Sequence, residues 1–263
     1  GSEMCIRDRH RAGCTKCHRK SAYILKIRKV LIKMLYENYE QVVANVKKAC
    51  ERSGRNFQDI TIIAVSKTKP LSDVEELLSH GVMEFGENKV QEMVDKYEHV
   101  SKPVHWHLIG HLQTNKVKYI VDKACLIHSV DSVHLAKEIE KEAAKKGVVA
   151  KVLLEVNIAQ EETKFGIRED EVYALIDAIK DMPHVHVMGL MTIAPFVENP
   201  EENRVYFRKM HQLSLDIKSK CIDNIDMSVL SMGMTNDYEI AVEEGATMIR
   251  VGTAIFGARN YNI

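Results

Sequence analysis

Several residues that can do chemistry lie at the ends of short apolar runs rich in β-branched side chains. Lys67 directly follows the run Ile60–Ser66, Asn88 follows the run Met83–Gly86, and His107 lies within Val104–Ile109. Burial at the end of a strand lowers the pKa of a lysine and frees its amine to act as a nucleophile or to form a Schiff base. The sequence therefore indicates amine chemistry at Lys67, with a solvated loop lysine as the alternative.

A second group of residues could bind an anion. Ser231 ends one apolar run and Gly233 follows it, while Arg250, Gly252 and Thr253 come at the end of the last run. Hydroxyl groups and backbone N–H groups that no side chain covers are suited to a phosphate. Arg250 precedes Gly252 by two positions, so strand alternation places both on one side of a sheet. For either loop alone, turn glycines with incidental hydroxyls are the alternative.

Strands and helices that would position these residues alternate along the chain. The expected strands are Ile60–Ser66, Met83–Gly86, Val104–Ile109, Leu126–Val130, Val152–Val156, Val185–Met191, Met227–Ser231 and Met248–Val251. Apolar residues at helical spacing predict helices over 71–81, 132–147, 168–182, 200–220 and 237–245. Gly81, Gly147 and Gly245 end three of them, as glycine does at helix C-termini.

This alternation predicts the fold class. Strand–helix repeats imply a parallel sheet with right-handed crossovers, and eight repeats are typical of a single α/β TIM barrel, (β/α)8, of about 250 residues. A doubly wound sheet is disfavoured because no G-x-G-x-x-G motif follows the first strand. In such barrels the chemistry lies where strands end, and the loops after strands seven and eight often bind phosphate.

The first 33 residues differ from the rest of the chain. They hold ten Lys and Arg residues against Glu3 and Asp8, a net charge of +8, which leaves −8 for the remainder of a chain that is neutral overall. We therefore expect residues 1–33 to be a basic leader that is foreign to the fold or disordered. An amphipathic helix is expected to begin at Met34, which we interpret as the natural start, and residues 34–263 to form the barrel domain.

Composition excludes several classes of protein. A net charge of zero argues against a nucleic-acid partner, and no apolar run approaches the roughly 20 residues of a membrane helix. Cys50, Cys125 and Cys221 are too widely spaced for a disulfide framework, so we expect a cytoplasmic protein.

Motifs spread over the body carry a family resemblance. The segments AVSKTKP, HGVMEFGENKVQE, WHLIGHLQTNK, GLMTIAP, LSMGMTND and IRVGTAIFGARNY, in this order, together resemble the pyridoxal phosphate homeostasis protein family (YggS-type, PROSC-like). The resemblance covers about residues 34–261 and extends to the N-terminal barrel of alanine racemase. It implies a cytoplasmic monomer that binds pyridoxal 5′-phosphate (PLP) as an internal aldimine, has no established turnover, and has apo PLP-dependent enzymes as possible partners.

The same resemblance implies roles for single residues. Lys67, rather than Lys69, matches the lysine of the Schiff base. Ser231, Gly233, Gly252 and Thr253 match the phosphate loops, and Asn88 and His107 lie in motifs near the mouth. Arg250 matches an arginine that faces the pyridine nitrogen, where a permanently charged donor disfavours protonation of the ring. This placement suits a carrier or a racemase-like site more than a transaminase.

Three functions compete at this point. The first is a non-catalytic carrier that buffers PLP and passes it to apo-enzymes. The second is an amino-acid racemase, which needs proton-transfer groups on both faces of the cofactor; the β domain that supplies one of them in alanine racemase is not expected here, because the sequence ends at Ile263. The third is a metal-dependent hydrolase, suggested by the pairs His105 with His107 and His184 with His186. We expect the carrier, with no metal.

Overall fold

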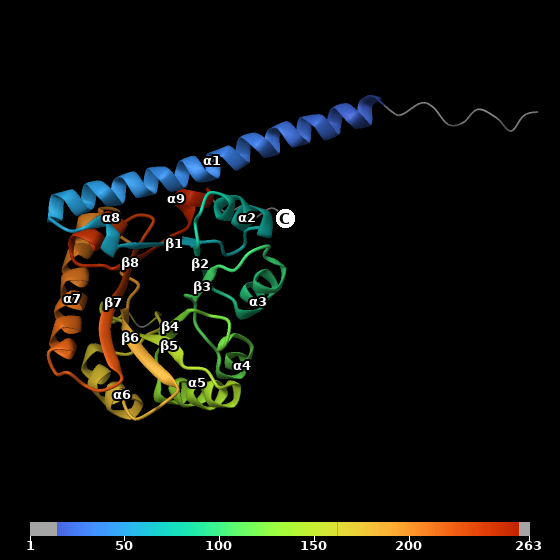
Figure 1. Cartoon of the computed structure of the whole chain (residues 1–263). Helices are drawn as coiled ribbons and strands as arrows, with labels where there is room; N and C mark the ends of the chain where they lie inside the picture. Colours follow the sequence, from blue (N-terminus) through green and yellow to red (C-terminus); the bar gives the residue numbers. More distant parts are fainter. Residues whose placement is uncertain (1–14, 162, 258–263) are drawn as a thin grey trace, which may run out of the picture.

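Eight parallel strands close into a barrel in chain order, with β8 pairing with β1 (Figure 1). The computed structural model describes residues 15–161 and 163–257, and for residues 15–33 it describes the backbone. The strands are β1 Thr61–Val65, β2 Glu84–Glu87, β3 His105–Leu108, β4 Leu126–Val130, β5 Ala150–Glu155, β6 Val185–Met191, β7 Ile225–Met234 and β8 Met248–Val251. The predicted TIM barrel is confirmed.

The predicted bounds hold for β4, β6 and β8, and β7 departs most from its prediction. It continues past Ser231 to Met234, and its pairing register with β8 shifts between these two residues. Gly233, within the shift, has a φ of 87°, and a Cβ there would lie 2.5 Å from the Cβ of Ala241. Glycine at this position therefore allows the end of β7 to pack closely against the next helix.

Helices cover the outside of the barrel (Figure 1). They are α1 Thr15–Ser53, α2 Leu71–Ser79, α3 Val90–His99, α4 Val117–Ile120, α5 Val133–Lys146, α6 Val172–Ile179, α7 Arg204–Lys218, α8 Tyr238–Glu243 and α9 Thr253–Phe256, with short 3-10 turns η1 Phe57–Asp59, η2 Thr114–Lys116, η3 Glu169–Glu171 and η4 Pro200–Asn203. The five predicted helices correspond to α2, α5, α6, α7 and α8. Each packs its apolar stripe against the sheet, as in α5, where Leu135, Ile139 and Ala143 are buried.

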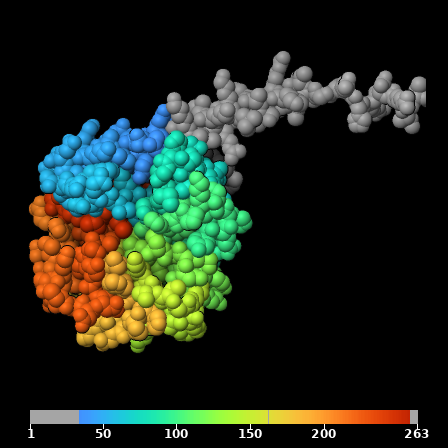
Figure 2. All heavy atoms as spheres, viewed as in Figure 1, coloured from blue at the N-terminus to red at the C-terminus, as the bar shows by residue number. Residues whose placement is uncertain are grey.

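The N-terminal helix begins earlier than predicted. It begins at Thr15 rather than at Met34, because no glycine or proline interrupts residues 15–53. From Leu35 onward its side chains pack on α2, α8 and α9, with Val42, Val46 and Ala49 buried. Figure 2 shows this part in blue against the red C-terminal segments. That residues 1–33 lie outside the barrel domain stays a prediction, and residues 1–14 lie outside the described residues.

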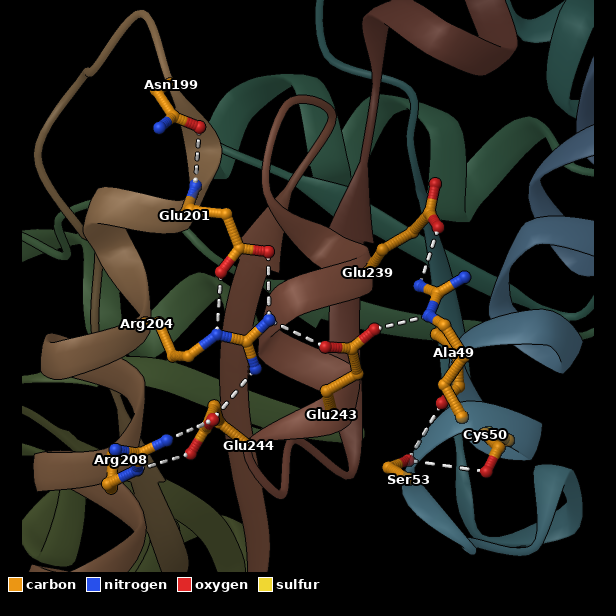
Figure 3. A network of polar contacts seen from close by, with 11 residues as sticks. Ala49, Cys50, Ser53, Asn199, Glu201, Arg204, Arg208, Glu239, Glu243 and Glu244 are labelled. Atoms are coloured by element: carbon orange, nitrogen blue, oxygen red, sulfur yellow. Dashed lines mark hydrogen bonds and ion pairs between the residues drawn. The ribbon is translucent and has the colours of Figure 1, made fainter.

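An ion-pair network fixes α1, α7 and α8 to one another (Figure 3). Glu243 of α8 accepts hydrogen bonds from Arg52 of α1 at 2.6 Å and from Arg204 of α7 at 2.7 Å. Arg204 also donates to Glu201 and Glu244. Hydrogen bonds to these carboxylates raise the pKa of Arg204 above its ordinary value. Because several charges share the network, it holds the helices beside β7 and β8 more firmly than an isolated surface pair could.

The main hydrophobic core lies between the sheet and the helices, where Phe85, Trp106 and Phe207 are fully buried. A smaller apolar cluster is formed by Leu126, Leu153 and Met191. Among the described residues, no helix combines the length and apolarity that crossing a membrane requires.

Candidate functional site

A cavity of about 540 Å³ opens at the carboxyl ends of the strands. Its walls come from the loops that follow β1, β2, β3, β5, β6, β7 and β8. Its volume is in the range of pockets that hold small ligands and cofactors. This is the end of the barrel where the sequence predicted the site.

The cavity brings together five of the eight residues singled out from the sequence. Lys67, Asn88, Arg250, Gly252 and Thr253 line it. The backbone of Gly252 leaves room there, since a Cβ would meet its nearest protein atoms, in Val65, at an ordinary 3.5 Å. The Oδ1 atom of Asn88 is buried and has no hydrogen-bond partner among the described residues, so a ligand donor could satisfy it.

His107, Ser231 and Gly233 are not among the lining residues. His107 and Ser231 are buried in hydrogen bonds inside the barrel, and Gly233 packs against α8. The mouth of the site beside β7 is formed instead by residues 234–237. The cause is the register shift in β7, which a strand pattern alone does not reveal.

Hydrogen bonds hold the backbone on both sides of Lys67. The hydroxyl of Ser66 donates to Glu87 at 2.6 Å, and the N–H of Thr68, which has a φ of 63°, donates to Glu92 at 2.5 Å. Lys96 joins the two carboxylates, with Nζ at 2.7 Å from Glu87 and 3.0 Å from Glu92. This network of polar groups fixes the direction in which Lys67 leaves the strand.

Glu87 and Lys96 are both buried, so their pairing is essential to this network. Burial raises the pKa of the Glu87 carboxyl, and the charge of Lys96 opposes that rise. Lys96 also donates to the carbonyl of Ser66 at 2.8 Å. Sequence reasoning missed both residues, although a charged side chain at the end of an apolar strand, as Glu87 is, could have indicated a buried partner.

Lys69 is oriented differently from Lys67. Its Nζ donates to the carbonyl of Phe256 at 2.8 Å, and it is not among the residues that line the cavity. It therefore links the loop after β1 to the end of α9.

Arg250 lines the cavity while being almost wholly buried. Its Nη1 donates to the hydroxyl of Ser231 at 2.7 Å and its Nη2 to the carbonyl of Thr192 at 2.8 Å. Burial lowers the pKa of Arg250 to about 10, although the charges of Glu155 and Asp237 oppose this. The guanidinium therefore keeps its charge at neutral pH.

The loops after β5, β6 and β7 supply lining residues that the sequence did not predict. Lys164 lies at this wall, paired with Glu161 and donating to the carbonyl of Ala194 at 3.0 Å. Asp237 accepts from the N–H of Met234 at 2.7 Å and from Asn203 at 2.8 Å. These side chains line the cavity beside the ends of β5 and β7.

The two histidine pairs that suggested a metal site do not come together in one site. His105 and His107 both contact Glu84, at 2.6 and 2.7 Å, whereas His184 contacts Glu140. Among the described residues, one cluster has side chains of the kinds that bind metals close enough together to share an ion: Glu84, His107 and Cys125. Glu84 begins β2, at the barrel end away from the cavity.

Comparison with known proteins assigns the family. Residues 38–260 match the family model "Alanine racemase, N-terminal domain". A pyridoxal phosphate homeostasis protein of Aquifex aeolicus is 45% identical over 226 residues, covering 86% of this chain and 98% of the relative. The chain belongs to this family. A pyridoxal phosphate homeostasis protein of Escherichia coli is 37% identical over 230 residues, covering 86% of this chain and 97% of the relative.

Solved structures of the family have the same barrel. PipY of Synechococcus elongatus with PLP bound matches with a TM-score of 0.71 at 31% identity, covering 81% of this chain and 100% of that chain. An alanine racemase of Clostridium difficile matches with a TM-score of 0.69 at 14% identity, covering 88% of this chain and 58% of that chain. The latter similarity shows the shared fold alone.

Proposed function

We propose that this protein binds PLP in the cavity at the barrel mouth and serves to buffer it and deliver it to apo-enzymes. The observation that carries the proposal is that Lys67 and Arg250 line one cavity of about 540 Å³. The amine of Lys67 suits the aldehyde of PLP, and the guanidinium of Arg250 suits the ring nitrogen. The family membership and the PLP-bound structure of PipY support the same ligand.

Lys67 is the residue that we propose to carry PLP as a Schiff base. Its backbone neighbours are held by Glu87 and Glu92, whereas Lys69 is bound to the carbonyl of Phe256. Bound PLP supplies a reversible covalent link to an amine and, in enzymes, an electron sink. The contribution of Lys67 is to hold the aldehyde carbon while the rest of the cavity orients the ring.

Arg250 is proposed to face the ring nitrogen. A guanidinium can only donate hydrogen bonds and does not give up its proton, so the nitrogen opposite it stays unprotonated. An unprotonated ring stabilises a carbanion poorly, which favours storage over turnover. Among the described lining residues, the other groups that could transfer a proton are held in the wall: Lys164 pairs with Glu161, and Asp237 accepts from Met234 and Asn203. We therefore propose a non-catalytic role.

The phosphate is proposed to lie against Gly252 and Thr253, with Thr235 on the neighbouring loop. The family motifs placed Ser231 and Gly233 in the phosphate loops, but neither lines the cavity. We propose that Ser231 acts by holding Arg250 and Gly233 by allowing the close packing of β7. Asn88 has a buried amide oxygen at the cavity and is proposed to contact the cofactor. His107 is proposed to act through its buried hydrogen bonds.

Delivery requires that the mouth be open to a recipient protein. The rim carries Phe196, which is 85% exposed. A single exposed aromatic side chain is ordinary on a protein surface, so Phe196 serves only to locate the rim that a recipient would contact. We propose a monomer in the cytoplasm, with apo PLP-dependent enzymes as recipients.

Absorbance spectroscopy followed by borohydride reduction and peptide mass mapping tests this function. Protein incubated with PLP should show an absorbance band of a lysine Schiff base, and reduction should add a pyridoxyl group to the peptide that contains Lys67. Lys69→Ala should label normally and serves as the matched control. Label on Lys69 alone, or an unchanged band in Lys67→Ala, would refute the assignment of Lys67. If the protein racemises L-alanine well above the rate of free PLP, the carrier function is wrong and the protein is a racemase.

A further inference from the structure

A chain of hydrogen bonds crosses the interior of the barrel from its far end to the cavity. It starts at Glu84 of β2, whose Oε2 lies 2.7 Å from Nε2 of His107 on β3. His107 Nδ1 lies 2.9 Å from Nε2 of His128 on β4, and His128 Nδ1 lies 3.0 Å from the hydroxyl of Ser231 on β7. Arg250 of β8 donates to that hydroxyl at 2.7 Å. We call these five residues the Glu84–Arg250 relay.

The chemistry of the two ends limits where the protons of the relay can lie. Arg250 has only donors, so the oxygen of Ser231 accepts from it, and the Ser231 hydroxyl can donate its own proton to Nδ1 of His128. At the other end, burial acts to raise the pKa of Glu84, but hydrogen bonds from His107 and His105 hold it below its ordinary value. The carboxylate is an acceptor, so His107 donates from Nε2.

One proton on each histidine then gives a single arrangement. His107 uses its single proton on Nε2, so its Nδ1 accepts from Nε2 of His128. His128 then carries its proton on Nε2 as well, which leaves Nδ1 to accept from Ser231. All hydrogen bonds point from Arg250 towards Glu84, and no donor faces a donor.

Burial keeps the relay in this state. His107, His128, Ser231 and Arg250 are each at most 4% exposed. Burial, with the charge of Arg250, lowers the pKa of His128 well below its ordinary value, so this ring stays neutral near pH 7. Glu84 is the one member with a substantially exposed side chain, at 29%.

We propose that this relay positions the Arg250 guanidinium for the bound cofactor. The inference rests on the proposed function for the identity of the ligand. Ser231 and the carbonyl of Thr192 occupy two of the five N–H donors of Arg250, and the residue lines the cavity, so donors remain for a ligand. His128 and Glu84 are positioning residues: neither lines the cavity, and each acts through the next member.

Nitrogen-15 NMR of the histidine rings tests the relay without any cofactor. In protein labelled on histidine, His128 should be neutral with its proton on Nε2 at pH 7 to 8, which reports that its Nδ1 accepts from Ser231. Ser231→Ala removes the hydroxyl that donates to His128, so His128 should lose this single tautomer. A charged His128, or a proton on its Nδ1 in the unaltered protein, would overturn the relay.

Cofactor release then tests what the relay does. His128→Leu has neither donor nor acceptor, whereas the amide of His128→Gln can donate to His107 and accept from Ser231. We expect PLP to dissociate several-fold faster from His128→Leu, with rescue in His128→Gln. We expect dissociation about tenfold faster from Ser231→Ala, which takes a charged hydrogen bond from Arg250. Ser129 follows His128 in the sequence and is equally buried. Ser129→Ala is therefore the control and should release PLP at the rate of the unaltered protein.

The outcomes separate this inference from the proposed function. Release at an unchanged rate from both His128→Leu and Ser231→Ala would refute the positioning role. If His128→Leu does not fold, the comparison of Ser231→Ala with Ser129→Ala decides the matter. If the unaltered protein binds no PLP, the proposed function fails, and with it the positioning role towards PLP, while the NMR result still decides the proton positions.

Discussion

Lys67, two residues after the end of β1, and Arg250 of β8 line the same cavity, and the pairing of these two strands closes the barrel. Arg250 lies opposite Ile63 in this pairing, so Lys67, four residues after Ile63, lies further towards the mouth. The backbone of Lys67 therefore lies nearer the opening than that of Arg250. A ligand with an aldehyde at one side of its ring and a nitrogen deeper in the cavity suits this order.

The phosphate contacts are tested by replacing Thr235 and Thr253 together with alanine. At about 1.5–3 kcal/mol for each hydrogen bond to a charged group, PLP affinity should fall more than about tenfold. The affinity for pyridoxal, which lacks the phosphate, should hardly change, and equilibrium dialysis measures both. Ser231→Ala is the matched comparison, because its effect should be similar for the two ligands. A double variant that weakens both ligands equally would mean that the phosphate lies elsewhere.

Lys96→Met should destabilise the protein strongly. It leaves the buried carboxylate of Glu87 without its cation, and breaking a buried pair costs about 3–5 kcal/mol of the free energy of unfolding. Because the same ammonium holds the backbone beside Lys67, PLP binding should weaken as well. Urea unfolding measures the first effect. The control Lys141→Met removes an exposed partner of Glu138 and should change neither quantity.

Glu155 should make stability depend on pH. Burial and the charge of Asp131 raise its pKa to about 7, against the opposing charge of Arg250. The folded state therefore disfavours the ionised form, and the free energy of unfolding falls as the pH rises from about 4.5 to about 7. Glu155→Gln should remove this penalty, with a gain of up to about 3 kcal/mol at pH 8 and almost none at pH 4.5. Unfolding measured at both pH values checks the sign.

The control for Glu155 is Glu198→Gln, which changes an exposed carboxylate. It should leave the pH dependence of unfolding unaltered. A gain in Glu155→Gln that is equal at pH 4.5 and pH 8 would show that its cause is packing rather than ionisation.

Deletion of residues 1–33 should leave both the melting temperature and PLP binding unchanged. The contacts of α1 with the barrel that the structure describes begin at Leu35, and the buried residues Val42 and Val46 remain in the shortened chain. Calorimetry and absorbance titration of the two chains provide the comparison. A drop of several degrees in the melting temperature would show that the leader contributes to the folded domain. Val46→Asp, which buries a charge, should be destabilising in both chains and confirms that the assay detects loss of α1 packing.

The sequence by itself determined the architecture. Alternation of β-branched runs with helical stripes requires a parallel sheet covered by helices, and eight repeats close it. The carboxyl ends of all strands in such a barrel lie at the same end, and the sequence pattern locates each strand end. Five residues could therefore be placed at the mouth before any contact was known: Lys67, Asn88, Arg250, Gly252 and Thr253. These predictions depended on local pattern alone.

Only the tertiary structure decided which residues stand at the wall and which stand behind it. Alternation along a strand shows on which side of the sheet a residue lies, but not how deep in the barrel it lies. Because of the register shift in β7, the cavity is lined by Met234 and the residues after it rather than by Ser231. Ser231 therefore became a partner of Arg250 and His128. The pairing of Glu87 with Lys96 and the contact of His128 with Ser231 also join residues from separate elements, and hydrogen bonds of that kind exist only once the barrel has closed.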